Sequence, residues 1–326
     1  MRPVRTAFAG ALLGVLTLAG CGQNSAPQGT TASAAPTSAT PSASSATAFA
    51  GSDGFPVTVQ AGNGPVVVQS RPERIVSLSP TATESLFAVG AGSQVVAVDD
   101  QSDYPAQTPK SALSGFKPNV EAIVEKKPDL VVLANDIDGV VAKLGKLGVP
   151  VLLEPAATKL DEAYDQIADL GAATGNTAKA QEVVTGMRKQ IDDLAAAAPK
   201  DKKLTYYHEL DSTPYSATST TFIGQIYGLF GLTNIADKAP EAAGGYPKLS
   251  AEFVAKADPD LVFLADTKCC GQSKETLAKR PGWSGLSALK KDQVVLLDDD
   301  IASRWGPRVV DLAKQVGDVV RKATTS

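Results

Sequence analysis

The chain has 326 residues, 43% of them hydrophobic and 20% charged, so it is long enough and apolar enough to bury the core of one or two domains. Its formal net charge is −4 and it carries no basic cluster, which argues against nucleic acid as a partner. The cysteines are too few for a disulfide framework, and no segment after residue 21 is long and apolar enough to cross a membrane.

The first 21 residues have the features of a processing signal. Arg2 and Arg5 precede an apolar run at 7–18, which is too short for a stable membrane anchor. The run ends in Leu-Ala-Gly-Cys at 18–21, which resembles a bacterial lipobox. The resemblance implies that Cys21 carries lipid, becomes the first mature residue and holds the protein on the outer side of the cell membrane. The alternative is an ordinary secretory signal with an incidental cysteine.

Residues 22–50 consist almost wholly of Ser, Ala, Thr, Pro, Gly and Gln. Such a segment has no apolar periodicity and cannot bury a core, so it is predicted to be a disordered tether. We expect the folded part to begin at about residue 51.

Short apolar strands then alternate with helical segments, a pattern typical of parallel sheets covered on both faces. Strands are predicted at 74–78, 95–98, 129–134 and 150–153. Strand patterns stop between 159 and 198, where two long helical patterns occur, the second at 177–198. Strands resume at 204–207, 261–265 and 294–297.

One segment occurs twice in the folded part. VEAIVEKKPDLVVLA at 120–134 recurs as AEFVAKADPDLVFLA at 251–265, with seven of fifteen positions identical. Each copy predicts a short helix with an early Glu, a Pro-Asp stop and an apolar strand. The repeat indicates two similar lobes, with an N-terminal lobe at 51–175, a linking helix at 176–200 and a C-terminal lobe at 201–326. The alternative is chance similarity, since helix–Pro-Asp–strand joints are common in α/β proteins.

Three features carry a resemblance to a known family, namely the repeat, RPERIVSLSPTATE at 71–84 and SDYP at 102–105. The chain resembles the substrate-binding lipoproteins of ABC importers for vitamin B12, ferric siderophores and haem. The resemblance covers about 55–322 and is closest to the vitamin B12-binding members. It implies two Rossmann-like α/β lobes with parallel sheets, joined by one long backbone helix, with a ligand cleft between the lobes. It also implies a monomer without a cofactor, whose ligand passes to separate permease and ATPase chains.

In that family an acidic residue on each lobe contacts arginines of the permease. The matching positions are Glu121 and Glu252, each in the first turn of a repeated helix. The alternative for each is that Glu simply favours a helix N-terminus, which contributes about 0.3–1 kcal/mol.

The resemblance also assigns residues to the cleft. Ligand pockets combine apolar or aromatic walls with a few polar groups. The residues that match cleft loops are Ser79 beside Thr81, Gln101, Tyr104, Phe116, Tyr215, Tyr246, Arg304, Trp305 and Arg308.

Aromatic walls suit a corrin ring, whereas arginines suit anionic siderophores. The chain has both, and it departs from the B12-binding pattern at Gln101 and at 115–116, where those members have Tyr and a Trp-containing region. The sequence therefore leaves cobalamin, a ferric siderophore and haem open as ligands.

Several residues can be interpreted in more than one way. His208, the only histidine, is either a haem or cobalt ligand or, as we prefer, a hydrogen-bonded residue at a strand end. Cys269 and Cys270 form a disulfide, stay as free thiols or bind a soft metal. A lone histidine among scattered carboxylates gives little support for a zinc or manganese site.

Functions of other classes have weaker support. The sequence contains no Gly-x-Ser-x-Gly elbow, P-loop or Gly-x-Gly-x-x-Gly after the first strand, so we predict that the protein is not an enzyme. The remaining alternative is a non-transport lipoprotein that binds a protein partner, which would require an exposed apolar patch.

Overall fold

The computed structural model describes residues 54–239 and 243–325, so the predicted signal, Cys21 and the tether lie outside it. The first lobe contains four parallel strands in the order β4-β3-β5-β6. Its central strands are apolar and buried along their whole length, as strands covered on both faces must be. Its elements are β3 (Ile75–Leu78), α1 (Pro80–Ala88), β4 (Val95–Val98), α2 (Val120–Val124), β5 (Leu130–Leu133), α3 (Val140–Lys146) and β6 (Val151–Leu153).

The second lobe repeats this plan. Its parallel sheet has the order β10-β9-β7-β8, which read from β8 is the strand order of the first sheet. Its elements are β7 (Thr205–Glu209), α6 (Phe222–Leu229), β8 (Thr233–Asn234), α7 (Ala251–Ala257), β9 (Leu261–Leu264), α8 (Thr267–Cys270), α9 (Lys274–Ala278), α10 (Ser287–Lys290), β10 (Val294–Leu296), α11 (Asp299–Ser303) and α12 (Val309–Thr325).

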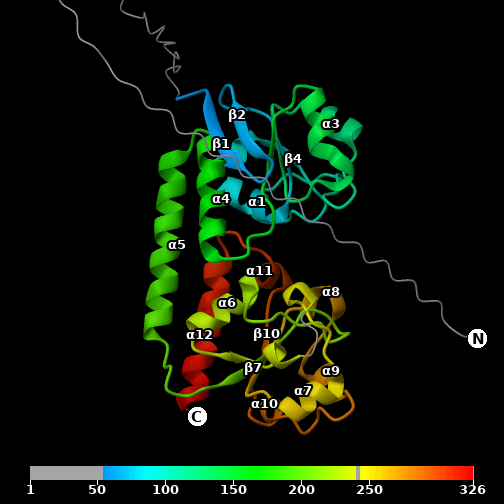
Figure 1. Ribbon diagram of the computed structural model, residues 1–326, viewed down its shortest axis with the longest axis vertical. Coiled ribbons are helices and arrows are strands. Elements are labelled where there is room, and N and C mark those ends of the chain that lie inside the picture. Colours follow the sequence, from blue (N-terminus) through cyan, green and yellow to red (C-terminus); the bar gives the residue numbers. More distant parts are fainter. Residues whose placement is uncertain (1–53, 240–242, 326) are drawn as a thin grey trace, which may run out of the picture. The chain divides into compact units, whose positions relative to one another are not determined.

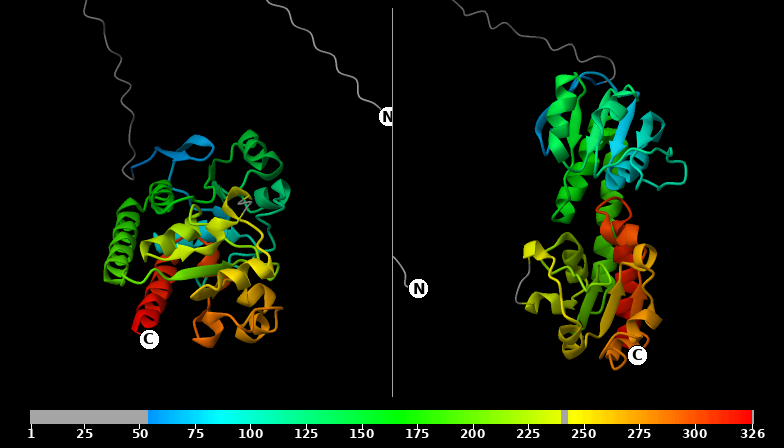
Figure 2. Two further views of the ribbon diagram at one scale, coloured as in Figure 1. Left: turned by 60° about the horizontal axis from the view of Figure 1, so that its bottom comes forward. Right: turned by 90° about the vertical axis from the view of Figure 1, so that its right-hand side faces the viewer.

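Two long helices stand between the sheets in the sequence, α4 (Leu160–Ala173) and α5 (Thr177–Ala197). Helix α5 packs against α4 and also against α12, so it contacts both lobes (Figures 1 and 2). Ala180, Met187 and Ile191 are its buried residues. The structure thus confirms the predicted fold class, two parallel-sheet α/β lobes with one long helix.

A hairpin that the sequence analysis did not predict precedes the first sheet. β1 (Val57–Ala61) pairs antiparallel with β2 (Gly64–Val68). Asn63, in the turn, donates to the carbonyl of Val151 at 3.0 Å and accepts from the amide of Leu153 at 3.1 Å. The turn is thereby fastened to the outer edge of β6, the last strand of the sheet.

No helix within 54–239 or 243–325 combines the length and the apolar character that a membrane span requires.

Candidate functional site

A cavity of about 380 Å³ opens where three loops of the first lobe meet the segment between α11 and α12. The loops follow β3, β4 and β5, and in an open parallel sheet ligands bind outside the carboxyl ends of the strands, where the strand order reverses. The cavity therefore lies where this fold places ligands. It is lined by Leu78, Ser79, Pro80, Thr81, Asp99, Gln101, Gly115, Phe116, Ala134, Asn135, Asp300, Ser303, Arg304 and Trp305.

Five of the predicted ligand-binding residues lie together in this lining, namely Ser79, Gln101, Phe116, Arg304 and Trp305. The Ser79 side chain accepts from the amide of Ala82 and so caps α1, which fixes the loop at the cavity wall. Phe116 is 69% exposed, an unusual state for a phenylalanine unless something else covers it.

Trp305 forms a wall with a fixed orientation. Its indole N–H donates to Oε1 of Gln166 in α4 at 2.8 Å. Trp305 also lines a small cavity of about 10 Å³, together with the buried residue Glu154. That space admits about one water molecule. The hydrogen bond to Gln166 therefore fixes the orientation of Trp305 at the ligand cavity.

An ion-pair cluster crosses between the lobes beside this wall. Glu84 of α1 accepts from Nη1 of Arg304 at 2.8 Å and from Nε of Arg308 at 2.8 Å. All three side chains are largely buried. The Arg308 guanidinium carbon also lies 4.2 Å from the ring centroid of Tyr104, which brings that predicted residue to the cluster.

Glu84 is the residue that the sequence analysis missed. It was visible as the last residue of the segment 71–84, on a helix whose faces are otherwise apolar or small. The available signal was an acidic residue inside a helix that is buried on nearly all sides, because such a charge requires a partner. Its partners lie more than 200 residues further along the chain, so they could not be named.

The other two predicted aromatic residues lie apart from this lining. Tyr215 and Tyr246 belong to loops of the second lobe and are 39% and 42% exposed. Tyr215 forms a bridge with Lys248, whose ammonium lies 5.7 Å from its ring centroid. Contact of these two tyrosines with a ligand remains a prediction.

The two acidic residues predicted to dock an importer have matching settings. Glu121 is in the first turn of α2, capped by Asn119, and Glu252 is in the first turn of α7, capped by Ser250. Both side chains are exposed. Each helix leads through a short turn into a buried central strand, β5 or β9.

His208 is in the core. It is fully buried in β7, its Nδ1 lies 2.8 Å from the Tyr227 hydroxyl, and burial lowers its pKa to about 3. This setting agrees with the preferred interpretation of His208 as a hydrogen-bonded residue of the strand, and the buried ring is inaccessible to a haem iron or cobalt ion in this conformation.

Cys269 and Cys270 form a disulfide between neighbouring residues of α8, so the free-thiol and metal readings are wrong for this state. The Asp299 carboxylate accepts from the backbone amides of Thr267, Lys268 and Cys269 at the start of this short helix.

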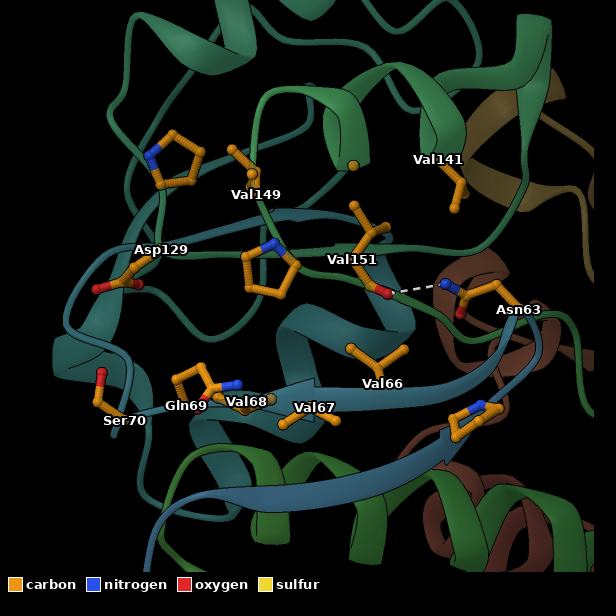
Figure 3. A pocket seen from close by; sticks show the side chains of 15 residues that line it. Asn63, Val66, Val67, Val68, Gln69, Ser70, Asp129, Val141, Val149 and Val151 are labelled. Carbon is orange, nitrogen blue, oxygen red and sulfur yellow. Dashed lines mark hydrogen bonds between the residues drawn. The ribbon is translucent and has the colours of Figure 1, made fainter. Parts of the chain in front are cut away.

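A second cavity of about 680 Å³ lies between β2 and the segment around β6 (Figure 3). Valines make up much of its wall, among them Val66, Val68 and Val149. Asn63 and Asp129 in its lining are already engaged with backbone groups of Val151 and Arg74. None of the predicted ligand-binding residues lies there, so the smaller cavity at Trp305 remains the candidate site.

Comparisons with known proteins agree with this fold. The model of the periplasmic binding protein family matches residues 75–301. The chain is 29% identical over 325 residues, 96% of each chain, to an uncharacterized ABC transporter substrate-binding lipoprotein of Bacillus subtilis.

Solved structures that are similar to the chain include a vitamin B12 binding protein and a heme-binding protein. The periplasmic vitamin B12 binding protein of Vibrio cholerae matches with a TM-score of 0.65 and 28% identity, over 78% of this chain and 98% of that one. The periplasmic heme-binding protein of Roseiflexus sp. RS-1 matches with a TM-score of 0.66 and 25% identity, over 76% and 99% respectively.

Proposed function

The chain belongs to the periplasmic binding protein family and is a substrate-binding protein of an ABC importer, and on this premise we propose that its ligand is a cobalamin. The observation that carries the proposal is the cavity bounded by Trp305 and Phe116, with Ser79 and Gln101 as polar groups. Exposed and half-buried aromatic faces suit a large, flat and partly apolar ring. The similarity to a vitamin B12 binding protein supports the same ligand.

A cavity of about 380 Å³ is at the small end of the range for ligand sites, so a cobalamin would extend beyond it. The exposed rings of Tyr215 and Tyr246 in the second lobe are available for the remaining surface of such a ligand. We infer that ligand binding uses these tyrosines together with Tyr104 and Arg308.

Haem is the second candidate, favoured by the similarity to a heme-binding protein. His208, the only histidine, is buried and cannot reach haem iron in this conformation, so iron would need another ligand.

The visible absorbance spectrum separates these ligands. Purified protein should be exposed in turn to cyanocobalamin, a ferric hydroxamate, a ferric catecholate and haem, and then freed of unbound ligand. We expect the cobalamin spectrum to remain with the protein in a one-to-one ratio. Retention of haem or of an iron complex in place of cobalamin would contradict the ligand assignment.

We further propose that the protein is a monomer tethered by residues 22–50 to a lipid on Cys21. The ordered charge, apolar run and Leu-Ala-Gly-Cys at the N-terminus support the anchor, and both segments lie outside the described residues. The Cys21→Ala protein should appear in the medium. Unchanged retention in the membrane fraction would contradict lipid anchoring.

The relatives are binding proteins of transporters, and we infer that this chain likewise binds its ligand without transforming it. Permease and ATPase would be separate chains, with Glu121 and Glu252 on the docking surface.

A further inference from the structure

Both arginines beside the cavity are held by one carboxylate. Glu84 accepts from Nη1 of Arg304 through Oε1 and from Nε of Arg308 through Oε2. A further bond joins Nη2 of Arg308 to Oε1. The carboxylate is nearly inaccessible to solvent and both guanidinium groups are largely buried, so the pairing is shielded from screening by salt.

Arg304 makes further polar contacts around the cavity through its two terminal nitrogens. Its Nη2 donates to Oδ1 of Asp300 at 2.6 Å and to the carbonyl of Gln101 at 3.1 Å. Its Nη1 lies 3.4 Å from Oδ1 of Asp103. A guanidinium group has five N–H donors in a fixed plane, and both terminal nitrogens of Arg304 already have partners.

Carboxylates outnumber cations around the cavity. Asp99 and Asp300 are in its lining, where Arg304 is the one cationic side chain among the described residues. Beside the lining lie two further carboxylates, Glu84 and Asp103, and one further cation, Arg308. Lys268 also pairs with Asp300, but it lies outside the lining and pairs with Asp298 as well.

We propose that Glu84 sets the charge selectivity of this cavity: by holding Arg304 and Arg308 it reserves the cavity for neutral or cationic ligands and excludes anionic ones. The inference rests on the proposed function, in that this cavity is taken as the ligand site. It assigns the ligand class by charge. The arginines alone would indicate an anionic ligand, whereas arginines that are paired with Glu84 do not attract one.

The exclusion has two physical causes. An anionic ligand must draw a guanidinium group away from Glu84, which leaves this buried carboxylate with only one of its two cationic partners. It must also approach the carboxylates of Asp300, Asp103 and Asp99, where like charges repel. A neutral corrinoid or a neutral iron complex meets neither obstacle.

Matched iron complexes test the proposal without relying on cobalamin. The probes are a neutral ferric trihydroxamate, a trianionic ferric tricatecholate, neutral cyanocobalamin and cationic aquocobalamin. Dissociation constants are measured for the wild type, for Glu84→Gln, which keeps the shape of the side chain, and for Asp300→Asn. Thermal unfolding monitored by circular dichroism establishes that each variant is folded.

We expect the wild type to bind at least one neutral or cationic probe, and the trianionic complex at least 30-fold more weakly. Glu84→Gln should improve binding of the trianionic complex at least tenfold relative to the neutral probes, and Asp300→Asn at least threefold. The gain should shrink at high salt for the anionic probe alone. If Glu84→Gln does not fold, Asp300→Asn gives the same comparison.

The two hypotheses fail in different ways. If the protein binds the neutral trihydroxamate but neither of the two cobalamins, the cobalamin assignment is overturned and the charge selectivity stays intact. Tighter binding of the trianionic complex by the wild type, or an unchanged preference in both variants, would overturn the role of Glu84. Binding of no probe at all would refute the cavity as a ligand site and the inference with it.

Discussion

Glu154 is a buried acid without a compensating cation in the described part of the chain. It is 4% exposed at the end of β6, and its Oε1 has no hydrogen-bond partner there. Burial, and secondarily the charge of Asp169, raise its pKa to about 8 from a usual value of 4.5. Between these two values the folded protein holds a proton that the unfolded chain releases, so this residue lowers stability as the pH rises from about 4.5 to about 8.

Glu154→Gln should remove that loss. The wild type loses stability as the pH rises from 5 to 8, and the variant does not. We therefore expect the unfolding free energy of the variant, relative to the wild type, to be roughly 1–3 kcal/mol higher at pH 8 than at pH 5, since one pKa unit corresponds to about 1.4 kcal/mol. The measurement is urea unfolding at the two pH values. Glu182→Gln is the control, because Glu182 forms an exposed pair with Lys179 that contributes little. An equal effect of Glu154→Gln at both pH values would contradict the assignment.

The two tryptophans lie in different environments. Trp305 lines the ligand cavity, whereas Trp283 is fully buried in the second lobe, where its indole N–H donates to the carbonyl of Ala251. A ligand should therefore quench Trp305 and leave Trp283 unaffected.

Trp305→Ala should abolish most of the fluorescence quenching by ligand and weaken binding by ~1–3 kcal/mol, the scale for burial of one large side chain. Trp283→Phe is the matched control and should keep the quenching. Unchanged affinity in a folded Trp305→Ala protein would assign Trp305 to a structural role.

Single residues differ in how far the sequence could predict them. The setting of Trp305, between Arg304 and Gly306 in a polar loop, was sufficient to place it at the cleft. The role of the arginines was not, because it depends on Glu84, which is 220 and 224 residues away. For His208 the sequence favoured a hydrogen-bonded residue at a strand end, but its partner Tyr227 could not be named, since nothing in the strand indicates it.

Among the elements, the repeated joints are the feature that the sequence showed most clearly. The helices α2 and α7 each begin at a side-chain cap and each carry an exposed Glu in the first turn. Side chains at matching points of two similar lobes suit a two-fold symmetric partner, and a carboxylate there can accept two bonds from one arginine.

Glu121→Ala combined with Glu252→Ala should stop uptake by cells while leaving ligand affinity unchanged. Both helices should persist, because each loses less than about 1 kcal/mol of dipole interaction. The assays are uptake of labelled cobalamin and binding to the purified protein. Glu125→Ala, an exposed change at the other end of α2, is the control. Normal uptake by the double variant would reassign both residues as helix-terminal charges, and lost affinity would place them at the ligand.

Strands were predictable where they form apolar runs between turn residues. Seven of the ten strands in the described part of the chain follow from such runs, within one or two residues of the predicted bounds. The β1–β2 hairpin was missed although Gly-Asn-Gly separates two runs rich in valine, a recognisable turn signal. β8, with two residues, and α8 and α11, with four and five, are too short for any periodicity to appear.

At the scale of the whole molecule, the repeat was enough to predict two similar lobes, but it carried no information on how they meet. Their meeting is set by pairs such as Arg304 with Glu84 and Trp305 with Gln166. These are side-chain contacts between distant segments, which no local pattern specifies.

The tether at 22–50 should be independent of binding. Proteins that begin at residue 22 and at residue 51 are expected to have the same dissociation constant for the ligand, because the segment has no residues suited to a pocket wall. Isothermal titration of both proteins is the measurement. A tenfold difference, about 1.4 kcal/mol, would show that the tether takes part in binding.

The pairing of Glu84 with Arg304 and Arg308 also bears on the order in which the chain folds. Closing a loop of 220 residues costs entropy that contacts within one lobe do not require, such as the bond from Trp283 to Ala251, 32 residues away. In refolding from denaturant, Trp283 should therefore regain its native fluorescence before Trp305. Arg304 follows the last strand, β10, in the sequence. In a chain that is exported N-terminus first, as the proposed signal implies, we therefore expect the ligand cavity to be completed last, after the chain has crossed the membrane.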